Sequence, residues 1–420
     1  MSDLFVELEW RGFVHHATQE IGTHLAAERR TVYCGFDPTA PSLQLGNLMP
    51  IMLLRHFQLA GHKPIVLMGG GTGLIGDPSG KRGERPLLSK QQIRENLQRQ
   101  RDQMARLLDF DTPETRAVVL DNAEWLTKQS LVDFLRDVGK HFSVNVMLQK
   151  ESVKARIEGG ISYTEFSYML LQAFDFLHLF RAKQCTIQVG GSDQWGNITA
   201  GIDLIRRVEG GEAHGLVAPL VTTASGAKFG KTEGGAIWLD PALTSPYQFY
   251  QFWINTDDRD AERYLKLFTL VSQDEIKALL RSHDKDPSRR EAQKRLAIEV
   301  TRLVHGKQAC SSAVAASAIL FDEFSPQEAE PGAFDVLAQE IPTVAASSAE
   351  SLTLVDAVVQ AGLAKSKSEA RRSIEQGGIY VNQQRVKDVV RTIGPADWLA
   401  GGNLLLRKGK KDYGLLRLHR

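Results

Sequence analysis

A regular alternation of strand-like and helical runs over residues 31–225 is the feature that most constrains the fold of this chain. The strand-like runs are short and rich in β-branched and aromatic residues, as buried strands are, and they lie at residues 31–36, 63–68, 117–120, 185–189 and 217–221. The segments between them have apolar residues at helical spacing. This order predicts an α/β fold with a parallel, doubly wound sheet.

Polar and glycine-rich loops follow several of the predicted strands. The first strand ends at Gly35 and Asp37, and its loop leads into a helix near residue 48, so a helix N-terminus with free N–H groups would face that loop. Loops rich in glycine follow the strands at 63–68, 185–189 and 217–221. Because ligands of doubly wound sheets bind beyond the carboxyl ends of the strands, we expect the binding site at this edge.

The predicted helix at residues 161–180 carries a polar stripe on an otherwise apolar surface. Tyr168, Gln172 and Asp175 stand at positions i, i+4 and i+7, on one helical face. Burying a phenol, an amide and a carboxylate is costly unless each finds a partner. The stripe therefore indicates a polar pocket in the core, although a solvated helix face is the plainer alternative.

Two loops carry cations that suit a polyphosphate. Lys228, Lys231 and the hydroxyl of Thr232 share one Gly/Ser/Thr-rich loop, and Lys81 and Arg85 share another. Such loops can close over a phosphate chain and neutralise developing charge. A lysine pair on a loop is often only solvated surface, but several cationic loops at one sheet edge favour the phosphate interpretation.

Residues 71–76 fit the pattern G-x-G-x-x-G, which raises a nicotinamide oxidoreductase as an alternative. Its context argues against that class, because Asp77-Pro78 prevents a helix from continuing there. The acidic residue expected about 20 positions later would be Glu95, inside a predicted helix rather than at a strand end. A phosphate-binding P-loop is excluded as well, since Gly80-Lys81 is followed by Arg82.

Charge is distributed unevenly along the chain. Residues 351–420 hold 13 Lys and Arg against 6 Asp and Glu, whereas the other 350 residues hold 38 against 44. A basic tail on a mildly acidic body suggests a polyanionic partner, with an ordinary basic surface as the alternative. Three scattered cysteines and the lack of a secretory signal or membrane span favour the cytoplasm.

The motifs taken together resemble those of a class I aminoacyl-tRNA synthetase, specifically a bacterial-type tyrosyl-tRNA synthetase. The matching segments, in the order of that family, are YCGFDPTAPSLQLGN, GTGLIGDPSGK, DVGKHFSVN, TEFSYMLLQAFDF, QVGGSDQWGNI, KFGKT and SPYQFYQFWINTDDRD. The tail LTLVDAVVQAGLAKSKSEARRSIEQGGIYVN is similar to an S4-type RNA-binding domain. The resemblance covers essentially the whole chain.

This resemblance implies a tyrosine–tRNA ligase and a role for each matching residue. The implied tyrosine-binding residues are Tyr33, Asp77, Tyr168, Gln172, Asp175 and Gln194. The implied ATP-binding residues are Cys34, Gly35, Asp37, Gly46, Gly191, Asp193 and Lys231. The implied catalytic residues are Thr39, Gln44, Asn47, Lys81, Arg85, Lys228, Lys231 and Thr232. Further partners would be tRNA(Tyr) and a second copy of the chain; Mg²⁺ would arrive with ATP, without a protein-bound metal or prosthetic group.

One motif departs from the family. Its first motif normally has the form His-(Ile/Leu)-Gly-His, and here Gln44 and Asn47 occupy the two histidine positions. Side-chain amides can still donate hydrogen bonds to a phosphate or ribose, but they carry no charge. We therefore expect an active enzyme, with a non-catalytic RNA-binding paralogue as one alternative. A tryptophanyl-type synthetase is another, although an indole pocket would not obviously need both Tyr33 and Asp175.

The resemblance also divides the chain into expected domains. A Rossmann-type catalytic domain would cover residues 1–225, with an insertion at about 126–160 as the dimer interface. The KFGKT loop and an α-helical anticodon-side domain would cover 226–321. A linker with several prolines would occupy 322–348, and a small α+β S4-like domain would occupy 349–420.

Overall fold

The structure is a computed structural model. It describes residues 3–79, 88–150, 153–154, 157, 160–227, 229–232, 235–321, 324–346 and 352–418. The chain divides into two compact units, one of residues 1–244 and 256–299, the other of residues 245–255 and 300–420. None of the helices in the described residues combines the length and the apolar character needed to span a bilayer.

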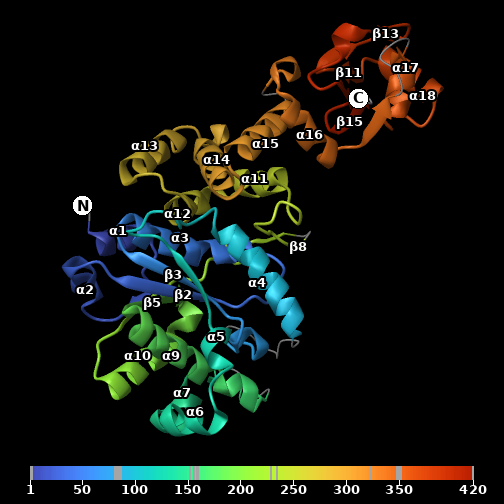
Figure 1. Ribbon diagram of the computed structural model, residues 1–420. Coiled ribbons are helices and arrows are strands. Elements are labelled where there is room, and N and C mark those ends of the chain that lie inside the picture. Colours follow the sequence, from blue (N-terminus) through green and yellow to red (C-terminus); the bar gives the residue numbers. More distant parts are fainter. Residues whose placement is uncertain are drawn as a thin grey trace. The chain divides into compact units, whose positions relative to one another are not determined.

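A six-stranded sheet forms the centre of the first unit (Figure 1). Its strands, in spatial order, are β1 (His16–Ala17), β6 (His214–Ala218), β5 (Cys185–Gly191), β2 (Thr31–Phe36), β3 (Lys63–Met68) and β4 (Val118–Asp121). The strands β2 to β6 pair in parallel, as predicted, and the short β1 adds an antiparallel edge that the sequence did not indicate. From β2 the chain first adds β3 and β4 on one side, then β5 and β6 on the other. The sheet therefore has its switch point between β2 and β5.

Helices cover both faces of this sheet (Figure 1). The helices on one face are α1 (Leu4–Arg11), α3 (Leu45–Leu59) and α12 (Asp258–Phe268). The other face is covered by α9 (Tyr163–Lys183) and α10 (Trp195–Glu209), which pack against each other and against β5. A core cluster joins sheet residues such as Tyr33 and Leu67 to Ala173 and Phe176 of α9. The predicted α/β class is confirmed.

The remaining elements of the first unit are short or peripheral. They are α2 (Ile21–Ala27), η1 (Thr72–Leu74), α4 (Lys90–Met104), α5 (Ala123–Leu126), α6 (Leu131–Asp137), η2 (Gly139–His141), α7 (Val144–Gln149), η3 (Ser192–Gln194), β7 (Lys231–Thr232), β8 (Gly235–Ala236), α13 (Gln273–His283), η4 (Pro287–Arg289) and most of α14 (Glu291–His305). Residues 123–137 form two helices, α5 and α6, separated by residues 127–130. The second begins anew because Ser130 Oγ caps it, accepting from the amide of Asp133.

The second unit holds helices and a small sheet. Its helices are α11 (Pro246–Ile254), α15 (Lys307–Leu320), η5 (Pro326–Glu328), α16 (Pro331–Glu340), α17 (Leu354–Gln360), α18 (Lys367–Glu375) and η6 (Pro395–Asp397). The five-stranded sheet has the order β12 (Gln384–Val386), β11 (Ile379–Val381), β14 (Asn403–Lys408), β15 (Asp412–Leu418) and β9 (Thr343–Ala346), and β10 (Leu352–Thr353) pairs with β13 (Thr392–Ile393). Residues 241–321, all described, contain no strand, as predicted.

The prolines of residues 322–348 do not mark a loose linker, contrary to the expectation from sequence. This segment forms α16 and β9, and its Phe334 and Leu337 are fully buried. They share one core cluster with Ile319 of α15 and Leu415 of β15. Pro331 stands in the first turn of α16, where its missing N–H costs nothing, so the residue that suggested a break starts a helix instead.

Histidine burial predicts that acid destabilises this fold. His56 of α3 is 6% exposed, its Nε2 has no hydrogen-bond partner among the described residues, and burial beside Arg11 and Arg55 lowers its pKa to about 3. In the unfolded chain this imidazole takes up a proton near pH 6.5. The stability that comes from keeping His56 neutral in the fold is therefore present above that pH and is lost as the pH falls toward 3. We expect protonation of this histidine to lower the free energy of unfolding by on the order of 3 kcal/mol between pH 7.5 and 4.5.

Urea unfolding of wild type and His56→Leu at pH 7.5 and 4.5 checks this expectation. The variant should lose less stability on acidification, because it has no imidazole to protonate. His15→Leu removes an exposed histidine and serves as the matched control. Equal acid sensitivity of wild type and His56→Leu would contradict the assignment.

Candidate active site

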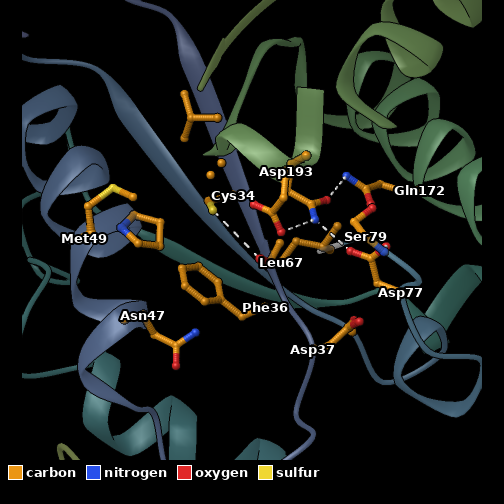
Figure 2. A pocket seen from close by; sticks show the side chains of 18 of the residues that line it. Cys34, Phe36, Asp37, Asn47, Met49, Leu67, Asp77, Ser79, Gln172 and Asp193 are labelled. Atoms are coloured by element: carbon orange, nitrogen blue, oxygen red, sulfur yellow. Dashed lines mark hydrogen bonds between the residues drawn. The ribbon is translucent and has the colours of Figure 1, made fainter. Parts of the chain in front are cut away.

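A cavity of about 640 Å³ lies at the carboxyl ends of β2 and β5, at the switch point of the sheet. Its walls come from β2, the start of α3, the loop after β3, α9 and the segment after β5. Figure 2 shows Asp77, Gln172 and Asp193 gathered on one side of this space, with Asn47 and Phe36 on another. The cavity lies at the edge of the sheet where we expect the binding site.

Tyr33 of β2 and Asp175 of α9 form one buried wall of the cavity. The Tyr33 hydroxyl is buried and has no hydrogen-bond partner among the described residues. Asp175 accepts hydrogen bonds from Trp125 Nε1 at 2.7 Å and Asn122 Nδ2 at 2.8 Å. Burial raises the pKa of Asp175 to about 7, although both hydrogen bonds act in the opposite direction. This wall therefore offers one fixed acceptor and one unused hydroxyl to a polar group of a ligand.

A chain of hydrogen bonds connects Asp175 to the opposite side of the cavity. Asn122 Nδ2 also donates to Thr72 Oγ1 at 3.0 Å, and Thr72 Oγ1 donates to Asp37 Oδ1 at 2.8 Å. The second oxygen of Asp37 accepts from the Tyr168 hydroxyl at 2.9 Å. Two residues of the predicted helical stripe, Tyr168 and Asp175, thus belong to one network that crosses the carboxyl edge of the sheet.

A second network surrounds Gln194, just after β5. Gln194 Nε2 donates to Asp77 Oδ2 at 2.7 Å, and Gln194 Oε1 accepts from Gln172 Nε2 at 3.2 Å. Asn197 Nδ2 donates to Gln172 Oε1 at 3.1 Å. The other oxygen of Asp77, Oδ1, accepts a hydrogen bond from the backbone amide of Ser79 at 2.9 Å. These polar groups are fixed in place, so they can orient a small zwitterion without rearranging.

The N-terminus of α3 opens into the same cavity. Gly46 and Asn47 line it, and Asn47 Oδ1 accepts from the amide of Gln44 at 2.9 Å, which leaves the Asn47 amide N–H₂ as a donor. Gln44 is not a lining residue; its Oε1 accepts from Lys231 Nζ at 3.4 Å. A helix N-terminus with an amide donor beside it suits an anion such as a phosphate.

Comparison with known proteins decides the family. Residues 26–322 match the family model described as tRNA synthetases class I (W and Y), and residues 333–416 match the tyrosine–tRNA ligase SYY-like C-terminal domain. The chain is 52% identical to the tyrosine–tRNA ligase of Roseiflexus castenholzii, over the full length of both chains. It belongs to the bacterial tyrosyl-tRNA synthetases. Tyrosine–tRNA ligase 1 of Bacillus subtilis is 51% identical over 99% of each chain.

Solved structures agree with this family. The C-terminally truncated mitochondrial tyrosyl-tRNA synthetase of Aspergillus nidulans has a TM-score of 0.70 at 32% identity, covering 76% of this chain and 95% of its own. The tyrosyl-tRNA synthetase of Archaeoglobus fulgidus, solved with L-tyrosine, has a TM-score of 0.55 at 15% identity, over 74% of this chain and 100% of its own, and shows the shared fold alone. The chain is thus an aminoacyl-tRNA ligase, and the tryptophanyl-type, paralogue and oxidoreductase alternatives are not favoured.

Most of the predicted site residues lie around the cavity. Its lining includes Tyr33, Cys34, Gly35, Asp37, Thr39, Gly46, Asn47, Asp77, Tyr168, Gln172, Asp175, Gly191, Asp193 and Gln194. Lys81, Arg85 and Lys228 lie outside the described residues, and of Thr232 only the backbone, in β7, is described. Lys231 is not part of the lining. Burial raises the pKa of the Cys34 thiol to about 12, so it enters the site as a neutral group.

The described lining is acidic. Its charged side chains are all carboxylates, those of Asp37, Asp77, Asp175 and Asp193. Such a wall favours a cationic group such as an ammonium and disfavours a polyphosphate. A polyphosphate at this site therefore needs cations from outside the described lining. Lys231, whose Nζ donates to Gln44 Oε1 just before α3, is a described cation near this edge. Among the described residues, no group of three or more His, Cys, Asp or Glu side chains could hold a metal ion.

The prediction from sequence missed several polar residues of the site. Of the two residues that hold Asp175, Asn122 directly follows β4 and Trp125 lies in α5; Thr72 begins η1, after β3. A polar residue at the carboxyl end of a parallel strand was the available signal for Asn122. Asn197 and Gln188 interrupt the apolar patterns of α10 and β5, and this signal was available but was not used in the prediction.

Proposed function

We propose that this chain activates tyrosine with ATP in this cavity and transfers the tyrosyl group to tRNA(Tyr). Tyr33 and Asp175 would bind the substrate phenol, and Asp77, Tyr168 and Gln172 its α-ammonium. The observation that carries this assignment is the buried Tyr33 hydroxyl, which has no hydrogen-bond partner among the described residues, beside a carboxylate held by two donors. A phenol satisfies both groups, whereas a phenylalanine ring would leave them unsatisfied.

The chemistry proposed for the first step is an in-line displacement at the α-phosphorus of ATP. An oxygen of the tyrosine carboxylate, oriented by Gln194, forms the new bond to phosphorus while the bond to the bridging oxygen of the β-phosphate breaks and diphosphate leaves. Cys34, Gly35, Asp37, Gly46, Gly191 and Asp193 would bind the nucleotide. No covalent enzyme intermediate is needed, so the residues position the reactants and stabilise charge.

Cationic and hydroxyl side chains would stabilise the leaving diphosphate. The assigned residues are Thr39, Lys81, Arg85, Lys228, Lys231 and Thr232, with Gln44 and Asn47 at the N-terminus of α3. Asn47 would donate through its free amide N–H₂, and Mg²⁺ would arrive bound to ATP. In the second step a ribose hydroxyl at the tRNA 3′ end attacks the acyl carbon, and AMP leaves.

The proposal extends to assembly, domains and location. Support for a homodimer comes from the apolar surface of α6 and α7, where Leu131 and Val132 are 72% and 71% exposed. The basic balance of residues 351–420 supports tRNA binding by an S4-like domain at residues 349–420. We assign residues 1–225 to catalysis and 226–321 to the KFGKT loop and the anticodon side. We place the enzyme in the cytoplasm, where its tRNA substrate would be charged.

Amino-acid-dependent exchange of labelled diphosphate into ATP tests the proposal. Tyrosine should support exchange, and phenylalanine and tryptophan should not, because only tyrosine brings a hydroxyl to Tyr33 and Asp175. Exchange with tyrosine would also demonstrate that Gln44 and Asn47 suffice in place of two histidines. A protein that binds tRNA but supports exchange with none of the three amino acids would contradict the proposal.

A further inference from the structure

One motif of the sequence has no part in the function assigned so far. The segment SPYQFYQFWINTDDRD ends in the first turn of α12, a helix that packs on α3 within the first unit (Figure 1). Asp260, the last residue of this motif, is 6% exposed although it carries a carboxylate. Carboxylates are rarely buried unless they hold a partner, so the surroundings of Asp260 indicate what it does.

The partner of Asp260 is the loop that follows β6. Asp260 Oδ2 accepts a hydrogen bond from the backbone amide of Ala224 at 2.8 Å. One helical turn further on, the Tyr264 hydroxyl donates to the carbonyl oxygen of Thr222 at 3.2 Å. Both hydrogen bonds go to the backbone of the loop. The helix therefore holds the start of the loop at two points, independently of the side chains that the loop carries.

An aromatic contact holds the same loop further along the chain. Phe229 is 6% exposed and stacks on Phe268, with ring centroids 5.1 Å apart and an interplanar angle of 12°. The ring of Tyr264 meets Phe229 edge-on, also at 5.1 Å. Asp260, Tyr264 and Phe268 stand at positions i, i+4 and i+8 of α12, on one helical face. One stripe of α12 therefore contacts the loop from its start to Phe229.

The held loop leads to the end of the cavity assigned to the phosphates. Phe229 lines the cavity, and Lys231, two residues later, donates from Nζ to Gln44 Oε1 at 3.4 Å. Gly230 has a φ of +73°, and a Cβ added there would lie 3.1 Å from Leu45 Cβ. This part of the loop therefore lies directly against the start of α3. Contacts with α12 on one side and with α3 on the other fix the backbone that carries Lys231.

We propose that Asp260 is a positioning residue for the activation of tyrosine, which holds the loop through the amide of Ala224 so that the cations of the loop meet the leaving diphosphate. The inference rests on the proposed function of the cavity. Asp260 is not a lining residue, so it acts on the reaction only through the loop. A loop that is fixed in advance stabilises the charge that develops on the phosphates without having to be ordered during the reaction. Loss of Asp260 should lower the rate of this step and leave tyrosine binding unchanged.

Single-turnover formation of tyrosyl-adenylate and equilibrium binding of tyrosine, both with the full chain, test this assignment. Asp260→Ala should lower the rate about tenfold, as for one lost hydrogen bond to a charged acceptor, with the Kd for tyrosine within twofold of wild type. Asp260→Asn keeps a side-chain oxygen for the amide of Ala224 and should recover most of the rate. Tyr264→Phe keeps the ring and should lower the rate about threefold. Glu262→Ala removes an exposed carboxylate of the same helix and is the matched control.

A background without the lysines of the loop shows whether Asp260 acts through them. In Lys228→Ala/Lys231→Ala, the further change Asp260→Ala should alter the rate less than twofold, because no lysine is left for the loop to place. A tenfold effect in both backgrounds, an unchanged rate in Asp260→Ala, or equal losses of rate and tyrosine affinity would overturn the proposal. Wild type that forms no tyrosyl-adenylate would instead refute the proposed function, so the two failures are distinguishable.

Discussion

Replacing Asp175 by asparagine is expected to raise the KM for tyrosine in diphosphate exchange about a hundredfold, with the KM for ATP nearly unchanged. Both oxygens of Asp175 accept hydrogen bonds, from Trp125 and Asn122. An amide at this position would turn its N–H₂ toward one of these donors, and the phenol would lose a charged acceptor. Removing one of the donors instead, with Asn122→Ala, should raise the KM for tyrosine about tenfold, because the carboxylate stays but is less firmly held.

The pH dependence of the same carboxyl separates this explanation from a general loss of structure. The pKa of Asp175 is raised to about 7, so tyrosine affinity should fall as the pH drops through 7 and the acceptor takes up a proton. Without ligand the folded state holds this proton more tightly than the unfolded state between pH 4 and 7. The contribution of Asp175 to the free energy of unfolding therefore falls as the pH rises through that range. Asp175→Asn should lose both of these contributions, while the contribution of His56 to stability remains.

Binding titrations and urea unfolding between pH 5.5 and 8.5 measure both effects. Asp274→Asn, a change of the same kind on an exposed helix of the first unit, is the matched control and should behave as wild type. A KM for tyrosine within threefold of wild type in Asp175→Asn would refute the assignment of Asp175 to the phenol.

Local sequence patterns were enough to predict the strands of the large sheet and most of the helices. The β-branched runs around Val32, Ile65 and Ile187 are buried on both sides of a parallel sheet, which is the environment that such runs indicate. The patterns failed where tertiary packing overrides them. Pro331 suggested a break but starts a helix whose Phe334 packs into the core of the second unit, and no local signal specifies that partner.

The site was predictable where polarity interrupts an apolar pattern. Tyr168 and Asp175 stood out on α9 for that reason, and both line the cavity. The residues that hold them did not stand out. Asn122 binds Asp175 across 53 positions of sequence, and its partner is set by the pairing of β3 with β4 and the docking of α9 on the sheet. Residues that hold a binding residue in place, as Asn122 holds Asp175, can be identified only once the fold is known.

Gly69→Ala should abolish detectable tyrosine-dependent exchange, because this glycine makes room for Asp37. A Cβ added at residue 69 would lie 2.1 Å from Asp37 Oδ1, 2.6 Å from Thr72 Oγ1 and 3.2 Å from Asp37 Cα. The two shortest contacts are with side-chain oxygens, which can rotate away only by breaking the hydrogen bond between them, and the contact with Asp37 Cα requires a further small shift of the backbone. Asp37 must move, and with it the hydrogen bonds that it accepts from Thr72 and Tyr168. Overpacking of this kind also destabilises by about 1–3 kcal/mol.

The loss of exchange should exceed what destabilisation alone can cause. Gly69→Ala is expected to remain folded at 25 °C by circular dichroism while tyrosine binding falls at least about a hundredfold, since Asp37 accepts from the Tyr168 hydroxyl, which we propose to bind the α-ammonium. Gly22→Ala is the matched control: its Cβ would meet Phe5 of α1 at 3.5 Å, an ordinary van der Waals contact between α2 and α1, so it should keep full exchange. A folded Gly69→Ala enzyme with wild-type tyrosine affinity would imply that Asp37 can leave this position without consequence. The network from Tyr168 to Asp175 would then not be what positions the amino acid.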